Sequence, residues 1–576
     1  MSEIQNVSLE KLEDAIDSPI STNHEKIIKS YEDNESDDVE TQKRDWRNHL
    51  IYNVGFNIFL HLVIAGYFSY VTYHYIEVTR KTCMDDCTLR LCSPYGMLLL
   101  VVGAVYLGVF YFKIFKRYFG TMIYSSVLEP IGRLFRRIFK GFLQKTILVA
   151  LVLAVLIGYS IFETRDDFTR LRALGGIAVF IAIGFLISAN KRLIVWRPVA
   201  CGFFFQFLLG VVFIRWPVGR EIFECFGEKV AAFLDFGKEG AAFVFGDFLV
   251  HEMGVFAFAV LPIIFFFSLC VSVSYYLGAM QWILFKLGWI LQSVLGTTIC
   301  ESVNAAGNIF LGQTESPLVI KPYINVLTHS ELHAVMVSGF STVSGSVMAA
   351  YISFGAQPQH LITATVMAAP ASLFFAKLVY PEHEESLTSM SNIKLEKSTD
   401  ASVLDAASNG ASQAIVLVLN IIANLVAFVA VVAFADSLLK WITILLGFED
   451  IGIQFVLGKV FMPVSWLIGV AWEDCEAVGN VIGTKTVVNE FVAFRVLGQY
   501  IENNEISKRS AAIATFAICS FANPSSIGIM VGGLSALAPE RRTSITKVVL
   551  RAFVSGCFVT LITASVASIL MPDDLL

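Results

Sequence analysis

Long apolar segments constrain this chain more than any other feature. A stretch of roughly 20 apolar residues is long enough to cross the hydrocarbon core of a bilayer as a helix. Only 16% of the 576 residues are charged, whereas a soluble domain has about 25%. The expected fold class is therefore an all-α polytopic membrane protein. The pattern predicts about eleven transmembrane helices, near 51–75, 95–112, 147–162, 173–189, 198–215, 254–280, 331–355, 359–379, 414–436, 453–471 and 545–570.

The charges predict the orientation of the chain. Thirteen Asp and Glu crowd the first 48 residues, a composition typical of a disordered, solvated tail. No apolar segment precedes residue 50, so no signal peptide is expected. Residues 113–145 contain eight Lys and Arg against one acid, which places this loop in the cytoplasm. Counting spans in both directions predicts a cytoplasmic N-terminus and an extracellular C-terminus.

The cysteines give one local prediction. Cys83, Cys87 and Cys92 cluster between the first two predicted spans, on the side that the topology places outside. One disulfide among them is plausible there. A metal site is less favoured because no histidine accompanies them.

Sequence motifs typical of hydrolytic and phosphate-binding enzymes are incomplete or absent. The sequence HEMGV at 251–255 lacks the second histidine of a zinc protease, and GNVIGTKT at 479–486 is one residue short of a phosphate-binding loop. No G-x-S-x-G motif occurs. A membrane enzyme that uses Glu315 and Glu490 as an acid and base remains an alternative of a different class, as does a channel or a receptor without transport activity.

Polar residues within the apolar region are concentrated in two clusters about 200 residues apart. The first is ESVNAAGNIFLGQTESPLVIKP at 301–322, and the second extends from EDCEAVGNVIGTKTVVNEFVAF through SFANPSSIGIMVGGLSALAPERR. Helices too short to cross the membrane flank each polar tip. Irregular backbone at this depth is tolerated only in a cavity or inside protein. We expect two re-entrant hairpins, about 300–322 and 508–535, in the inverted repeats of a secondary transporter.

The tips also carry capping signals. Ser316 precedes Pro317 and Asn523 precedes Pro524, an order that favours helix starts at the tips. The positive ends of both half-helices would then face a common site.

The motifs resemble those of the concentrative nucleoside transporter family. GTKTVVNEFVAF (483–494) is similar to its signature, and GNIFLGQTESPLVIKPY, GSVMAAYISFGA and FANPSSIGIMVGGLSALAP are similar to further blocks. The resemblance covers roughly 170–570, and the additional N-terminal spans resemble vertebrate-type members. It implies a sodium-coupled homotrimer whose transport part moves against a fixed scaffold. The amphipathic stretch 220–246 would belong to that scaffold and lie along the membrane surface.

The resemblance also implies residue roles. Nucleobase contacts match Gln313, Thr314 and Glu315, and ribose contacts match Glu490, Asn523 and Ser526, with Phe521 as an aromatic residue beside the sugar. Base preference matches Gly312, Gln313, Ser346 and Val347, in a combination similar to the type that accepts purines and pyrimidines. The sodium site matches Asn308, Leu311, Thr342 and Val343. Pro524 departs from the bulky apolar residue expected at its position.

Structural alternatives remain open at these residues. Glu490 could form an ion pair with Lys485 or Arg495, although an intramembrane carboxylate is by default functional. Asn523 and Ser526 could only cap a helix, and Ser346 and Val347 could only permit close helix packing. Asn304 and Glu301 are expected to be scaffold, and Arg541 and Arg542 to end the second hairpin at a membrane surface.

Together these observations predict a multi-pass plasma-membrane symporter that imports nucleosides with sodium, without other cofactors. A proton-coupled or base-selective symporter of the same fold is the alternative. The predicted domains are an acidic tail (1–48), N-terminal transmembrane helices (49–165) and a transporter core (166–576). The hydrophilic loop 380–412 receives no role.

Overall fold

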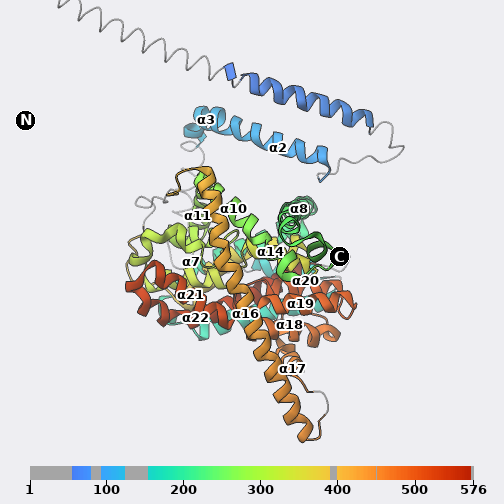
Figure 1. Cartoon of the computed structure of the whole chain (residues 1–576). Coiled ribbons are helices and arrows are strands. Elements are labelled where there is room, and N and C mark those ends of the chain that lie inside the picture. The colour runs from blue at the N-terminus through green and yellow to red at the C-terminus, as the bar shows by residue number, and fades with distance from the viewer. Residues whose placement is uncertain are drawn as a thin grey trace, which may run out of the picture. The chain divides into compact units, whose positions relative to one another are not determined.

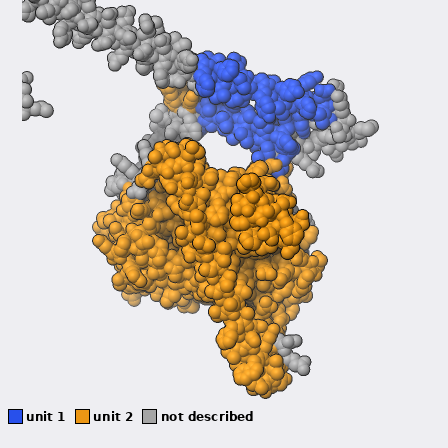
Figure 2. Space-filling view, in the orientation of Figure 1, with its two compact units in different colours: residues 1–112 blue, residues 113–576 orange. Residues whose placement is uncertain are grey.

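The computed structural model describes residues 55–56, 58–78, 92–123, 154–165, 167–388, 398–448 and 451–571. The predicted acidic tail and most of the basic loop lie outside these ranges. The chain divides into two compact units, residues 1–112 and 113–576 (Figure 2). In the first unit, a helix through residues 58–78 packs on α2 (Pro94–Val109), and the rings of Tyr75 and Tyr95 stack 4.2 Å apart. Cys92 takes part in a disulfide; Cys83 and Cys87 lie outside the described residues, so a pairing within the cluster stays a prediction.

The described part of the second unit is helical and contains no strand. Its principal helices, joined by short 3-10 and π-helical turns, are labelled in Figure 1. Their bounds are α3 (Lys116–Ile123), α6 (Arg172–Leu186), α7 (Trp196–Gly210), η5 (Val211–Arg215), α8 (Pro217–Phe245), α9 (Phe256–Ala259), α10 (Ile263–Tyr276), α11 (Ala279–Leu295), α12 (Ile299–Gly307), η7 (Ser316–Val326), α13 (His329–Phe340), α14 (Gly345–Ser353), α15 (Pro358–Val379), α16 (Val403–Leu445), α17 (Ile453–Leu467), α18 (Cys475–Val487), α19 (Glu490–Glu502), α20 (Lys508–Ile518), α21 (Pro524–Leu537) and α22 (Arg542–Leu570).

The helices from α10 to α22 form two repeats of one pattern. In the first, α10 is followed by α11, the hairpin α12–η7, the broken helix α13–α14 and α15; in the second, α16 is followed by α17, the hairpin α18–α19, the broken helix α20–α21 and α22. Corresponding pairs pack together: α11 lies along α12 as α17 lies along α18, and each hairpin closes on itself. The paired helices α10 and α16, and α15 and α22, join the repeats.

The repeats are inverted. The N-terminal turn of α15 and the residue after the C-terminal end of α22 line one small cavity, so these corresponding helices run antiparallel. The breaks of the two broken helices meet, because the Phe521 amide donates a hydrogen bond to the Thr342 carbonyl at 3.1 Å. Two interrupted helices thus place irregular backbone in the interior, where protein rather than lipid surrounds it.

The second hairpin lies earlier in the chain than the sequence pattern predicted. The prediction of about 508–535 covers α20 and α21, which both pack along α22, whereas α18 packs against α19. The hairpin therefore occupies Cys475–Glu502, and NPSSIG marks the restart of a broken helix. The reason is that a cap followed by proline marks any helix start, whether at a hairpin tip or at a break. The predicted span 331–355 is likewise interrupted, at residues 341–344.

Six helical segments in the described residues are long and apolar enough to cross a membrane. They are Trp196–Arg215, Phe256–Tyr276, His329–Ser353, Pro358–Val379, Val403–Leu445 and Pro539–Leu570. Other predicted spans correspond to shorter apolar helices, among them α2, α6 and α17. A polytopic helical membrane protein is therefore confirmed, while the number eleven stays a prediction.

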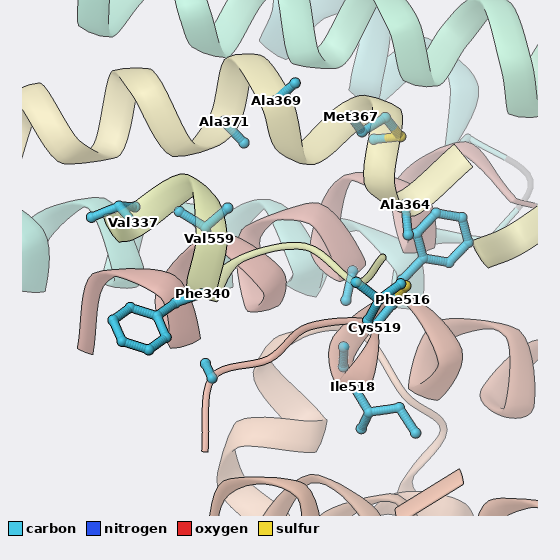
Figure 3. Close-up of a cluster of buried hydrophobic side chains, with 14 of the residues drawn as sticks. Val337, Phe340, Ala364, Met367, Ala369, Ala371, Phe516, Ile518, Cys519 and Val559 are labelled. Carbon is cyan, nitrogen blue, oxygen red and sulfur yellow. The ribbon is translucent and has the colours of Figure 1, made fainter. Parts of the chain in front are cut away.

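The core of the second unit lies among α13, α15, α20 and α22. Phe340, Met367, Phe516 and Val559 come from these four helices and are at most 1% exposed (Figure 3). A Cβ atom at Gly556 of α22 would lie 2.6 Å from Cβ of Phe340. This close approach is the use of small residues expected between membrane helices.

Candidate functional site: a polar cavity between the hairpin tips and the broken helices

A cavity of about 380 Å³ lies where the two repeats meet. Both hairpin tips, both breaks and one face of α16 contribute to its wall. All seven residues predicted to contact substrate line it, and so do Gly312 and Val347 of the predicted selectivity set. The seven are Gln313, Thr314, Glu315, Glu490, Phe521, Asn523 and Ser526. Ser346 does not line the cavity; its hydroxyl lies 2.6 Å from that of Ser344, which does.

The first tip, residues 308–315, presents amide and carboxylate groups. Glu315 Oε2 accepts a hydrogen bond from the Gly312 amide at 2.8 Å, which fixes the turn. Gln313 is only 6% exposed, and its Oε1 atom has no hydrogen-bond partner in the described part of the chain. A buried acceptor without a partner costs about 1–3 kcal/mol, so this tip is suited to a donor from a ligand.

The second tip holds a carboxylate at the start of α19. Asn489 caps this helix by accepting from the Val492 amide at 3.0 Å, and Glu490 is the first helical residue. An acidic residue in the first turn is favourable because the helix dipole is positive there. Local sequence therefore explains why Asn and Glu stand together in the otherwise apolar neighbourhood.

Asn523 connects the carboxylate to the break of the second broken helix. Its Nδ2 donates to Glu490 Oε2 at 2.6 Å, and its Oδ1 accepts from the Ser526 amide at 3.0 Å. Asn523 thus caps α21 and also orients Glu490. Pro524 occupies the first helical position of α21, where a proline ring fits without loss of a hydrogen bond.

Glu490 makes no direct ion-pair contact in the described residues, although the charge of Lys485 acts on it from a greater distance. Lys485, on α18, is 2% exposed, and across the described residues no ion pair joins it or Arg495 to Glu490. The Asn523 amide holds the carboxylate and the Tyr351 hydroxyl lies beside it, and a carboxylate with four lone-pair sites still has acceptor capacity for a donor from the cavity.

The four residues of the predicted sodium site lie around the first tip and the first break. Asn308 Nδ2 donates to the Asn304 carbonyl at 3.1 Å and to Ser338 Oγ at 3.0 Å. Because both N–H groups are used, its buried Oδ1 is left without a partner in the described structure. Thr342 Oγ1 donates to the Ser338 carbonyl at 2.9 Å and keeps its acceptor lone pairs. Leu311 and Val343 are 4% and 0% exposed. Free oxygens in a buried site suit a hard cation.

One wall of the cavity was not predicted from the sequence. Gln413, Asn420 and Asn424 of α16 line it, although 414–436 was interpreted only as an apolar span. This wall could have been predicted from the spacing of the three amide residues. Positions 413, 420 and 424 share one face of a helix, and they stand in an otherwise uncharged segment. Asn489 and Ser525, which were also not predicted, line the cavity beside the second tip and the second break.

Comparison with known proteins identifies the family. Three family models match: Na+ dependent nucleoside transporter N-terminus at 175–248, nucleoside recognition at 257–358, and Na+ dependent nucleoside transporter C-terminus at 360–568. Sodium/nucleoside cotransporter 1 of Mus musculus is 40% identical over 516 residues, which cover 86% of this chain and 77% of that protein. The chain belongs to the concentrative nucleoside transporter family.

Other members of the family extend the comparison. Solute carrier family 28 member 3 of Homo sapiens is 40% identical over 84% of this chain and 72% of its own length. The structure of CNTnw in an inward-facing substrate-bound state is 39% identical and covers 70% of this chain and 98% of that chain, with a TM-score of 0.66. A CNTnw variant in an outward-facing state gives a TM-score of 0.67 at 38% identity. The fold of this chain is thus that of the family.

Proposed function

We propose that this chain is a sodium-coupled symporter that imports nucleosides by alternating access. The relatives above are named as sodium/nucleoside cotransporters, and the CNTnw structures include inward-facing and outward-facing states. The observation that carries the proposal is the single cavity in which the predicted nucleobase residues and the predicted ribose residues face a common space. Membership of a transporter family also argues against the enzyme alternative.

The chemistry of the cavity supports a neutral polar substrate. The Gln313 amide has a free acceptor and two N–H donors, which suit the edge of a nucleobase. Glu490 accepts from ribose hydroxyls while Asn523 holds it in place, and Phe521 provides an apolar surface beside the sugar. Its volume of about 380 Å³ is within the range of small-molecule sites.

Sodium is proposed as the coupling ion, held as a co-transported substrate by Asn308, Thr342 and the backbone carbonyls of Leu311 and Val343. The geometry explains how its binding would favour the nucleoside. The Phe310 carbonyl accepts from the Gly345 amide at 3.0 Å, which ties the first tip to the first break. An ion that orders this junction would also order the tip that carries Gln313. The coupling is then reciprocal, so nucleoside would raise sodium affinity.

Base selectivity, assembly and location are finer parts of the proposal. Gly312, Gln313 and Val347 at the cavity wall, with Ser346 acting through Ser344, would accept both purines and pyrimidines. The chain would assemble as a homotrimer in the plasma membrane, with a cytoplasmic N-terminus and an extracellular C-terminus. A proton-coupled or base-selective symporter of the same fold is the alternative.

Uptake into cells or proteoliposomes tests the proposal. Radiolabelled uridine and adenosine should both accumulate against their gradients when sodium is outside, and should not accumulate when choline replaces it. The recovered label should be unchanged nucleoside. Accumulation driven by a proton gradient without sodium, or of only one base class, would favour the alternative; equilibration without accumulation would indicate a channel.

A further inference from the structure

A second, smaller cavity lies away from the hairpin tips. It has a volume of about 40 Å³, more than the roughly 10–15 Å³ that one water requires. η5, α8, the first turns of α15 and the residue after α22 form its wall. Its lining residues are Phe213, Ile214, Arg220, Phe223, Gln359, His360, Thr363 and Met571.

The polar groups in this cavity lack partners. Within the described residues the Arg220 guanidinium makes no hydrogen bond or ion pair, and its Nη1 atom is buried. Arg215, the last residue of η5, differs because its Nε lies 2.5 Å from Glu163 Oε1. Arg220 as a whole is half-buried, but a buried N–H donor without an acceptor costs about 1–3 kcal/mol, so a ligand with acceptor oxygens is the expected occupant.

Two further side chains strengthen this expectation. His360 is 8% exposed and Thr363 is 3% exposed. In the part of the chain that the structure describes, neither side chain has a hydrogen-bond partner, and both line the cavity. Imidazole, hydroxyl and guanidinium groups all donate hydrogen bonds. Three donors that converge on one space suit an anion with several oxygens.

The helix ends around the cavity indicate that it lies near the membrane surface. Three candidate spans end there: Trp196–Arg215 by its C-terminal end, Pro358–Val379 by its N-terminal end and Pro539–Leu570 by its C-terminal end. The ends of membrane-spanning helices lie near the interface, which is the level of lipid phosphates. The stacked rings of Phe213 and Phe223, 3.7 Å apart, form an apolar border beside the charged group.

We propose that this cavity is a phosphate-binding site at the membrane surface, which takes the headgroup phosphate of a phospholipid or free inorganic phosphate. Arg220 supplies the charge, because a guanidinium binds phosphate oxygens through paired N–H groups. His360 and Thr363 donate from the first turns of α15. Since Arg220 belongs to α8 and the other two to α15, the bound phosphate links the helix predicted to lie along the membrane surface to a transmembrane helix.

Thermal unfolding of the full chain in detergent tests the proposal. The probes are inorganic phosphate and a short-chain phosphatidylglycerol, with chloride at equal ionic strength as the reference. A ligand that binds only the folded state raises the unfolding midpoint. We expect a rise with phosphate or the lipid but not with chloride. Arg220→Gln should weaken binding about tenfold or more, and Lys229→Gln, which removes an exposed charge from the same helix, should not.

The two probes and the variants distinguish the possible occupants of the cavity. Stabilisation by the lipid alone identifies a headgroup site, and equal stabilisation by both probes shows that phosphate itself suffices. Thr363→Val serves as a second, nearly isosteric variant that should weaken the response if Arg220→Gln does not fold. Equal responses of the Arg220 and Lys229 variants, or of phosphate and chloride, would overturn the proposal.

Discussion

Replacement of Glu490 by glutamine is the sharpest test of the central cavity. The Glu490→Gln side chain keeps the shape of the original and an oxygen that can accept from Asn523, whose Nδ2 lies 2.6 Å from Glu490 Oε2. The change removes the negative charge that a ribose hydroxyl would meet. Hydrogen bonds to charged groups contribute about 1.5–3 kcal/mol, and each 1.4 kcal/mol is about a factor of ten. We therefore expect kcat/KM for sodium-dependent uridine uptake to fall about 10- to 150-fold.

The substrate can be changed as well as the protein. A nucleoside that lacks the 3′-hydroxyl has one donor fewer for the carboxylate, so the wild-type protein should transport 3′-deoxyuridine less efficiently than uridine. Glu490→Gln should reduce uptake of this analogue much less than uptake of uridine. This pattern is a double-mutant cycle between the carboxylate and the hydroxyl. It separates loss of one contact from general damage to the transporter.

A matched control is available on the same helix. Glu502 is the last residue of α19 and is exposed, so Glu502→Gln should leave uptake unchanged. Surface biotinylation should report similar amounts of all three proteins. Normal uridine uptake by Glu490→Gln would refute the assignment of Glu490 to the substrate site. Equal losses for uridine and its deoxy analogue would refute the hydroxyl contact and leave only a structural role.

Three further predictions test the proposed sodium site, the Asn523–Glu490 contact and a buried ion pair elsewhere in the second unit. Ser338→Ala removes the oxygen that accepts from Asn308 Nδ2. Asn308 would then be held less firmly at the proposed sodium site, and the sodium concentration for half-maximal uptake should rise about 2- to 10-fold. An unchanged sodium concentration for half-maximal uptake would exclude a role of Ser338 in positioning Asn308. Asn523→Asp keeps a capping oxygen but brings two carboxylates together, so uridine uptake should be lost while folding, followed by gel filtration, persists; normal uptake would contradict the arrangement. Lys377, whose Nζ pairs with Glu301 and lies 2.9 Å from Ser330 Oγ, is buried, so Lys377→Met should cost about 3–5 kcal/mol and lower the unfolding midpoint. Adding Glu301→Gln should recover part of that loss, and a double variant less stable than the single one would show that the pair is not the cause.

The first hairpin could be located from the sequence because the residues that mark its tip are close together in the chain. GQTESP contains a polar tip, a serine and a proline in one short stretch, and the structure turns there. The second hairpin has no proline or glycine at its tip: Val488 and Asn489 connect α18 to α19. Its only marker was an asparagine cap followed by a glutamate, which the more obvious NPSSIG outweighed.

The substrate residues were predicted from family resemblance, and the structure brings all seven to one cavity. Their roles in binding stay predictions. The amides of α16 could not be assigned in this way, because the sequence does not show which element or cavity a given face of a helix contacts. The interruption at 341–344 was similarly hidden, since STVSG is polar but too short to lower the hydropathy of a long window.

The length of α16 has its own consequence. The helix contains 43 residues and slopes across the second unit beside α17 (Figure 1). No charge interrupts it between Asp405 and Asp436, a distance of roughly 45 Å along the helix axis, whereas the hydrocarbon layer is about 30 Å thick. A helix longer than the layer is thick can be accommodated by tilting. A substrate that moves along the bilayer normal past a tilted α16 would contact different residues of this helix, and so different amide side chains, at different depths.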